Sequence, residues 1–169
     1  MRAGTVGLPP DAMPPAPPAR FAYEVCPKIA VFSGERVLVA RRTREEELDG
    51  VYTLVGGKLE TSDRDVLAGI HRELREELGG GLIVRILTTY AVMAEFTKRG
   101  GVRMVLPHYY GELSGGSIVV GSEYSDFRWL MPDELEARRD VFQNVAIVCR
   151  QLVRLASSAG ATDYTEVAT

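Results

Sequence analysis

"GGKLETSDRDVLAGIHRELREELGG", residues 56–80, contains three glutamates within the five positions from Glu73 to Glu77, behind a pair of glycines. At about 100° per residue, Glu73, Glu76 and Glu77 fall within one arc of a helix over residues 65–79. Like charges at this spacing repel by roughly a few tenths of a kcal/mol per exposed pair. The pattern therefore predicts a carboxylate-lined cleft that binds a cation. Aliphatic side chains form an adjoining stripe that faces the core: Leu67, Ile70, Leu74 and Leu78.

A divalent metal is the cation that this stretch favours. A hard ion such as Mg²⁺, with Mn²⁺ as an alternative, requires clustered oxygen ligands and shares its shell with water and substrate phosphates. Gly56 and Gly57 let the backbone turn sharply and approach a ligand, so a main-chain carbonyl can join the carboxylates. Two structural alternatives stay open: a solvated charged helix, and a tight turn that needs glycine for its geometry alone.

The surrounding sequence predicts an α/β fold, a sandwich in which a mixed β-sheet lies between helices. Residues 28–34 and 35–42 are rich in valine and isoleucine around Ser33-Gly34, which is typical of a β-hairpin. Further strands are predicted at residues 50–57, 82–96, 102–113 and 125–131, the middle two as an antiparallel pair around "TKRGG". A short helix is expected at 133–139 and a closing amphipathic helix at 141–157, with apolar residues three and four apart: Phe142, Val145, Cys149, Leu152 and Leu155.

The length and composition indicate one domain. The chain has 169 residues and a net charge of −3, which suits a single core over residues 21–157. Residues 1–20 are rich in proline and alanine and predict a disordered leader, with a docking arm as the alternative. Residues 158–169 are small and polar without an apolar period, which predicts a flexible tail.

The cysteines and the hydropathy pattern indicate the compartment. Cys26 and Cys149 lack the spacing of a zinc site, so we expect buried free thiols in a reducing cytoplasm. No stretch approaches the roughly 18 apolar residues of a membrane span. The slightly acidic balance gives no long-range attraction to nucleic acid or to a membrane surface. The sequence therefore predicts a soluble cytoplasmic protein.

Residues 56–80 strongly resemble the Nudix box, the signature of the Nudix hydrolases. Its pattern is a glycine, five residues, Glu, seven residues, and then Arg-Glu-aliphatic-any-Glu-Glu-any-Gly. The run from Arg72 to Gly79 matches the second half completely. The approach "VYTLVGGKLE" and the later "SEYSDFRWLMPDEL" resemble other segments of the family, so the likeness spans about residues 28–157. It implies a Nudix-type α/β/α sandwich.

The first half of the box departs from the pattern. Five residues after Gly57 the chain has Asp63 where the family has Glu, and eight residues rather than seven separate Asp63 from Arg72. A one-residue insertion in the loop or the first helical turn accounts for this, and a loop absorbs such a residue at little cost. Either Asp63 or Glu60 then takes the supporting role of the first glutamate.

The resemblance implies a role for each matching residue of the helix. Glu73 and Glu77 become the main metal ligands, and Arg72 orients Glu73. Glu76 becomes a further ligand or a water-mediated contact, and Gly56 supplies a carbonyl ligand.

Residues outside the helix complete the expected site. Glu123, just before the segment with Trp129, is the chosen distal carboxylate, which acts as a base or another ligand in this family. Glu112 and Glu95 are the weaker candidates for that role. Three cations near the cleft in sequence are expected to hold phosphates: Lys58, Arg41 and Arg42. The candidates for a stacking surface, with core packing as the alternative, are Tyr52, Phe96, Tyr109 and Trp129. Neither His71 nor His108 is given a catalytic role.

The resemblance implies Mg²⁺-dependent hydrolysis of a nucleoside diphosphate linked to another group. A compact chain resembles the MutT-like members that take nucleoside triphosphates or similar small nucleotides, rather than a nucleic acid polymer; a homodimer stays open. One alternative is a non-catalytic module on the same fold that senses a nucleotide or binds a partner. Another is an isomerase of isopentenyl diphosphate, but that enzyme needs a catalytic cysteine in its own motif, which the context of Cys26 does not match.

Overall fold

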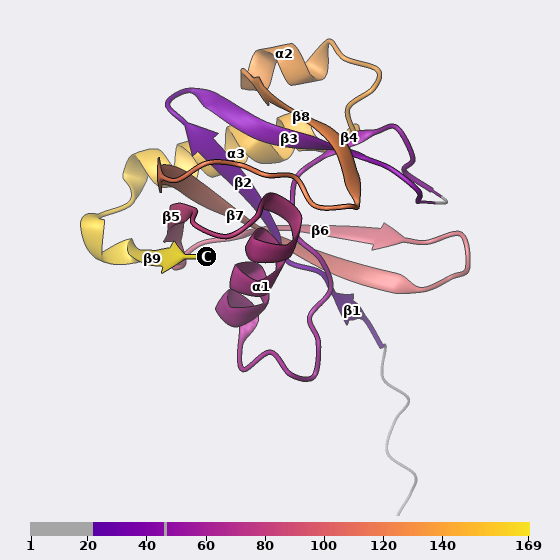
Figure 1. Cartoon of the computed structure of the whole chain (residues 1–169), viewed down its shortest axis with the longest axis horizontal. Helices are drawn as coiled ribbons and strands as arrows, with labels where there is room; N and C mark the ends of the chain where they lie inside the picture. Colours follow the sequence, from indigo (N-terminus) through magenta and orange to yellow (C-terminus); the bar gives the residue numbers. More distant parts are fainter. Residues whose placement is uncertain (1–21, 46) are drawn as a thin grey trace, which may run out of the picture.

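The protein is described by a computed structural model of residues 22–45 and 47–169 (Figure 1). The predicted leader, residues 1–20, lies outside the described residues. The helices are α1 (Val66–Leu78), α2 (Pro132–Glu136), α3 (Val145–Ser158) and the 3-10 helix η1 (Ala161–Asp163). The strands are β1 (Glu24–Val25), β2 (Lys28–Ser33), β3 (Arg36–Arg42), β4 (Tyr52–Thr53), β5 (Ile83–Leu87), β6 (Val92–Thr97), β7 (Arg103–Gly115), β8 (Tyr124–Leu130) and β9 (Tyr164–Ala168).

One mixed sheet contains all nine strands of the described residues, with β7 at its centre. β7 pairs in parallel with β1 and β2, and antiparallel with β5 and β6. β3 pairs with β2, β4 and β8. The strand predicted at 82–96 is therefore two strands, since β5 and β6 pair with opposite ends of β7 and residues 88–91 lie between them.

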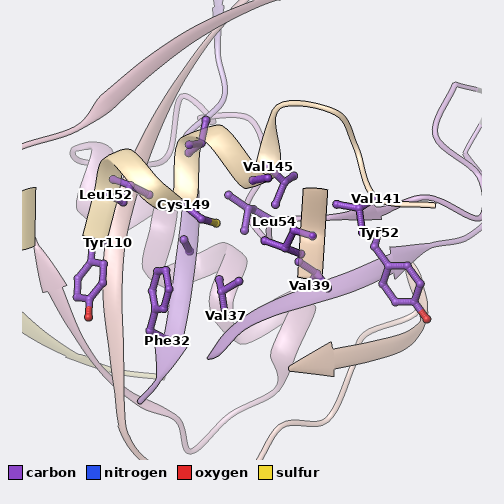
Figure 2. Close-up of a cluster of buried hydrophobic side chains, with 14 of the residues drawn as sticks. Phe32, Val37, Val39, Tyr52, Leu54, Tyr110, Val141, Val145, Cys149 and Leu152 are labelled. Atoms are coloured by element: carbon purple, nitrogen blue, oxygen red, sulfur yellow. The ribbon is translucent and has the colours of Figure 1, made fainter. Parts of the chain in front are cut away.

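Alternate residues of β2 and β3 supply two cores, one on each face of the sheet. Ile29 and Val31 of β2 pack in the core that includes the apolar stripe of α1. Ala30 and Phe32 pack in the other core, which includes Cys149 and Leu152 of α3 (Figure 2). Figure 1 accordingly shows α1 and α3 on opposite faces, which confirms the predicted α/β/α sandwich.

The ends of α1 follow local capping rules. Asp65 has an extended backbone, and its side chain accepts a hydrogen bond from the N–H of Ala68 at 2.8 Å. Gly79 ends the helix with a φ of 86°, and its N–H donates to the Arg75 carbonyl. The predicted helix over 65–79 is thus confirmed. None of the helices in the described part of the chain is long and apolar enough to cross a membrane.

The C-terminal segment differs from the predicted flexible tail. Residues Tyr164–Ala168 form β9, which pairs antiparallel with β5 at the edge of the sheet. Val167 is buried in the core beneath α1, and the side chain of Thr169 accepts from the N–H of Leu82 and donates to the carbonyl of Gly79. The segment is ordered because it completes the backbone hydrogen bonds of β5, whereas its own sequence shows no apolar periodicity.

The closing helix begins later than predicted. α3 starts at Val145, because the N–H of Phe142 donates to the Tyr52 carbonyl and Val141 forms a bridge with Tyr52. Residues 141–144 thereby connect β4 to the helix and bring Phe142 to the cavity described below.

Candidate active site

Two adjoining cavities lie beside the β6–β7 hairpin, one toward α1 and the loop after β4, the other toward β4 and the start of α3. The first has a volume of about 300 Å³ and is called here the acidic cavity, because Glu73, Glu77 and Glu123 line it. The second, about 90 Å³, is called the apolar cavity, and Phe96, Leu106 and Phe142 are among its lining residues. Both are lined by five residues in common, namely Lys28, Arg42, Leu48, Phe96 and Leu106.

Glu77 is the most deeply buried acidic side chain of this region, with 3% of its surface exposed. One carboxylate oxygen accepts the N–H of Gly56 at 2.5 Å, and the other accepts the hydroxyl of Tyr124 at 2.8 Å. Burial, together with the charge of Glu77, raises the pKa of Tyr124, so this hydroxyl stays protonated and donates. Glu77 therefore holds the helix, the glycine turn and the start of β8 together.

Glu73 lies one turn earlier on the same face of α1. Its carboxylate rests against the backbone of Gly57, in the space that a Cβ atom at residue 57 would fill. Burial raises the pKa of Glu73, the Arg72 guanidinium opposes this rise, and the charge of Glu77 adds to it. Glycine at position 57 thus makes room for a carboxylate whose negative charge is only partly compensated.

Gly56 requires glycine for two reasons. Its φ of +118° lies in the left-handed region, and a Cβ atom there would collide with the carbonyl of Pro27. The turn orients its N–H toward Glu77 and its carbonyl toward the ammonium of Lys28, which donates a hydrogen bond to it. The expected carbonyl ligand therefore lies beside the acidic cavity.

Arg72 connects the box helix to the preceding loop. Its Nε and Nη2 donate to the two carboxylate oxygens of Asp63 at 3.1 and 2.9 Å. Nη1 donates to Glu73 at 2.6 Å, and Nη2 also donates to the carbonyl of Lys58 at 2.9 Å. These bonds raise the pKa of Arg72 and lower that of Asp63, so both groups stay charged.

The same contacts distinguish the role of Asp63 from that of Glu60. Asp63 is 6% exposed, pairs with Arg72 through both oxygens and also accepts the N–H of Glu60. Glu60 is 62% exposed and lies 3.9 Å from Arg72. Of the two residues left open by the spacing, Asp63 is therefore the one that supports Arg72.

Glu76 differs from its two neighbours. It is 53% exposed, and it accepts a hydrogen bond from Arg72 at 3.3 Å. It does not line either cavity in the described residues. A role at the metal would require a change of its side-chain rotamer or an intervening water.

The three expected phosphate-binding cations have different surroundings. Arg42 is 12% exposed, lines both cavities and pairs with Glu45 and Glu123 at 3.0 and 3.2 Å. Arg41 donates to the carbonyl of Gly50 and does not line either cavity in the described residues, because adjacent residues of a strand point to opposite faces. Lys58 lines the acidic cavity, paired with the exposed Glu24 at 2.7 Å.

The three candidates for the distal carboxylate differ in whether they line a cavity. Glu123 is 66% exposed and lines the acidic cavity beside Arg42. Glu95 lines the apolar cavity. Glu112 accepts two bonds from Arg85 on β5 and does not line either cavity in the described part of the chain.

Among the four expected aromatic residues, Phe96 lines both cavities and contacts Phe142 edge to face, with ring centroids 6.1 Å apart. Tyr52, Tyr109 and Trp129 pack with the two cores. Phe142, Tyr124 and Lys28 are site residues that sequence reasoning missed. The position of Tyr124 directly after Glu123 could have suggested a place in the site. No feature of the sequence around Lys28 relates that residue to the Nudix box.

Both thiols are buried and unpaired, as predicted. Cys26 lines the acidic cavity, and burial raises the pKa of its thiol, which keeps it in the poorly nucleophilic neutral form. His71 lies on α1 with Nε2 at 2.9 Å from the Ala168 carbonyl oxygen.

His108 should make stability depend on pH. Burial lowers its pKa to about 4, from about 6.5 in an unfolded chain. The neutral ring therefore contributes stability that is complete above pH 6.5 and is lost as pH falls toward 4, by about 3 kcal/mol. Denaturant unfolding of wild type and His108→Asn at several pH values measures this, since their difference isolates His108 from the carboxylates. Equal pH slopes in the two proteins would contradict the expectation.

The donor atoms around the acidic cavity fit a hard divalent cation. The residues positioned to hold one are Glu73, Glu77 and the carbonyl of Gly56, all of them oxygen donors. In the described residues no group of three His, Cys, Asp or Glu side chains is gathered closely enough to hold a metal by itself. Waters and substrate oxygens commonly complete the coordination of a hard divalent cation at such a site.

Comparisons with known proteins agree with the resemblance found in the sequence and with the fold. The family model of the NUDIX domain matches residues 25–151. The crystal structure of a MutT NUDIX hydrolase from Burkholderia pseudomallei is similar over 78% of this chain and 99% of that chain, with 23% identity and a TM-score of 0.62. A NUDIX hydrolase from Nitrosomonas europaea is similar over 83% and 95%, with 14% identity and a TM-score of 0.65.

A third similar structure is the NUDIX domain of Shewanella oneidensis NrtR, solved in complex with ADP ribose. It matches over 80% of this chain and 90% of that chain, with 19% identity and a TM-score of 0.61. At these identities the structures show the fold alone, and a search among curated proteins found no significant match. The family model, which covers most of the chain and includes the complete Arg72–Gly79 motif, shows the membership. This chain therefore belongs to the NUDIX family.

Proposed function

We propose that this protein is a Mg²⁺-dependent hydrolase that cleaves a pyrophosphate bond in a nucleoside diphosphate linked to another group. The substrate class is a nucleoside triphosphate or a similar small nucleotide, and Mn²⁺ is the alternative metal. The observation that carries the proposal is the pair of carboxylates, Glu73 and Glu77, in a cavity that adjoins an apolar one lined by Phe96 and Phe142. The first cavity suits the phosphates and the second the nucleoside.

Glu73, Glu77 and the Gly56 carbonyl would hold the metal, with Glu76 as a further or water-mediated ligand. When bound, Mg²⁺ neutralises charge on phosphate oxygens and lowers the pKa of a coordinated water. Arg72 fixes the orientation of Glu73 through a 2.6 Å hydrogen bond, and Asp63 fixes Arg72. The N–H of Gly56 and the hydroxyl of Tyr124 keep the Glu77 side chain in one rotamer.

The remaining groups bind phosphate and accept a proton. Arg42 lines both cavities and can pair with phosphate oxygens, and Lys58 also lines the acidic cavity. Glu123 accepts the proton of the attacking water, because its carboxylate lines the acidic cavity beside Arg42. The P–O bond to the bridging oxygen breaks, and the leaving phosphate departs with that oxygen.

A binding module that senses a nucleotide is the second candidate. The NUDIX domain of Shewanella oneidensis NrtR, solved with ADP ribose, is an example of this fold holding a nucleotide derivative. Loss of box carboxylates would favour such a module, whereas Glu73, Glu76 and Glu77 are all present here. Hydrolysis is therefore the better-supported function.

A substrate panel tests the proposal. Nucleoside triphosphates, nucleotide sugars, ADP-ribose and dinucleoside polyphosphates should be incubated with Mg²⁺ and, in parallel, with chelator. We expect metal-dependent release of a nucleoside monophosphate together with pyrophosphate or a phosphorylated leaving group. In ¹⁸O-labelled water, the label should enter a product phosphate directly. A trapped covalent phosphoenzyme would overturn the mechanism, and tight nucleotide binding without turnover would favour the sensing module.

A further inference from the structure

Lys28 lies at the boundary of the two cavities and lines both of them. It is the first residue of β2, opposite His108 on β7. Its ammonium donates a hydrogen bond to the carbonyl of Gly56. A lysine charge therefore acts at the centre of the site, although nothing in the box motif includes it.

The side chain of Lys28 is not needed to build this part of the fold. Backbone pairing between β2 and β7 holds residue 28, and the N–H of Ile29 donates to the Val55 carbonyl at 3.0 Å. The turn at Gly56 is already held by the bond from its N–H to Glu77. In the described residues Lys28 forms no ion pair with a carboxylate, and its hydrogen-bond partner is the neutral carbonyl of Gly56. A charged donor bonds an anion more strongly than a neutral acceptor.

The contact with Gly56 has a consequence for the metal. The carbonyl oxygen that accepts from Lys28 is the same oxygen that the proposed function assigns to the dication. An ammonium and a dication on one oxygen would repel strongly in a partly desolvated cavity. The flexible four-carbon stem of lysine lets the ammonium move away, and the anion that reaches both cavities is the phosphate of the substrate.

We propose that Lys28 is a substrate-binding residue whose ammonium gives up the Gly56 carbonyl to the dication and then pairs with the substrate phosphate next to the nucleoside. The inference rests on the proposed function. It predicts that removing the charge of Lys28 has opposite effects on two affinities. Metal binding becomes tighter, because no ammonium competes for the Gly56 carbonyl, and nucleotide binding becomes weaker, because the phosphate loses a cationic partner.

The test uses Lys28→Met, which keeps the apolar stem. Mn²⁺ binding without nucleotide, followed by the electron paramagnetic resonance signal of free Mn²⁺, should be about 3- to 10-fold tighter than in wild type. KM for the best nucleotide of the panel should rise by about 10-fold or more. Lys28→Arg, which restores the charge, should return KM most of the way to the wild-type value.

Lys98→Met is the matched control, since Lys98 lines the acidic cavity from the start of the β6–β7 turn and its loss changes the net charge equally. Its Mn²⁺ affinity should stay within about twofold of wild type, because in the described residues no hydrogen bond or ion pair joins the Lys98 side chain to Gly56, Glu73 or Glu77. Melting temperatures without metal show that each variant is folded.

The outcomes separate the two proposals. Absence of Mn²⁺ binding and of hydrolysis in wild type would refute the proposed function and this inference with it. If wild type binds Mn²⁺ and turns over nucleotide, unchanged or weaker Mn²⁺ binding in a folded Lys28→Met protein would refute the role of Lys28 alone. The same holds if tighter Mn²⁺ binding appears equally in Lys98→Met.

Discussion

Glu77→Gln should reduce kcat/KM with Mg²⁺ on the order of 10³-fold, which corresponds to about 4 kcal/mol in the barrier. The glutamine has the shape of the glutamate but lacks its charge, so a metal loses a ligand. Its NH₂ group also faces one of two donors, the Gly56 N–H or the Tyr124 hydroxyl, and leaves that donor without an acceptor. The loss therefore combines weaker metal binding with a displaced glycine turn.

Thermal unfolding with and without Mg²⁺ provides an independent readout. Mg²⁺ should raise the melting temperature of wild type by mass action on the folded state, and Glu77→Gln should lose most of that rise. Glu112→Gln is the control, because Glu112 pairs with Arg85 away from the two cavities. Glu76→Gln should cause a smaller loss of activity, since its side chain is half exposed. An equal Mg²⁺ shift in wild type and Glu77→Gln would refute Glu77 as a ligand.

Arg72→Ala should reduce kcat/KM by about 100-fold, the upper range for residues that orient metal ligands. Without the guanidinium, Glu73 and Asp63 lose a shared partner while both remain largely buried. Burial and the charge of Glu77 then raise the pKa of Glu73 with only the charge of Lys28 left to oppose them, so its carboxylate is both less oriented and more readily protonated. Activity measured at pH 6 and pH 8 should show a larger loss at the lower pH.

Arg75→Ala is the matched control, since it removes an exposed arginine from the same helix and should change activity little. Asp63→Ala should cost less than Glu73→Gln, because Asp63 acts through Arg72. Glu60→Ala should cost less again, since Glu60 is exposed and 3.9 Å from Arg72. A greater loss at Glu60 than at Asp63 would reverse the assignment, and equal complete losses at Asp63 and Glu73 would show that Asp63 has a direct role.

Local rules explain why the sequence alone predicted the helix and the carboxylates of the site. Helical periodicity relates residues three and four apart, and the caps Asp65 and Gly79 lie next to the residues they satisfy. The motif from Arg72 to Gly79 is contiguous, so the sequence alone indicates the family, and the family model confirms this membership. The sandwich followed from the alternation of apolar residues in strands and their spacing in helices.

Contacts between distant residues were decided by the tertiary structure. The sequence did not predict β9, because the order of this strand depends on pairing with β5, about 80 residues earlier, rather than on its own composition. Arg41 and Arg42 are adjacent and chemically identical. Only the orientation of β3 decides that Arg42 lines the cavities and Arg41 does not.

The residues of the site also divide into those that the sequence predicted and those that only the folded structure identifies. Residue spacing did not distinguish Asp63 from Glu60, whereas in the folded chain both carboxylate oxygens of Asp63 accept hydrogen bonds from one edge of the Arg72 guanidinium. Lys28 and Tyr124 join the box through the pairing of β2 with β7 and of β8 with β3. By itself the sequence determined which carboxylates share a helix face, because that relation is local. The tertiary structure decided which cations and donors surround them, because those come from strands far apart in the chain.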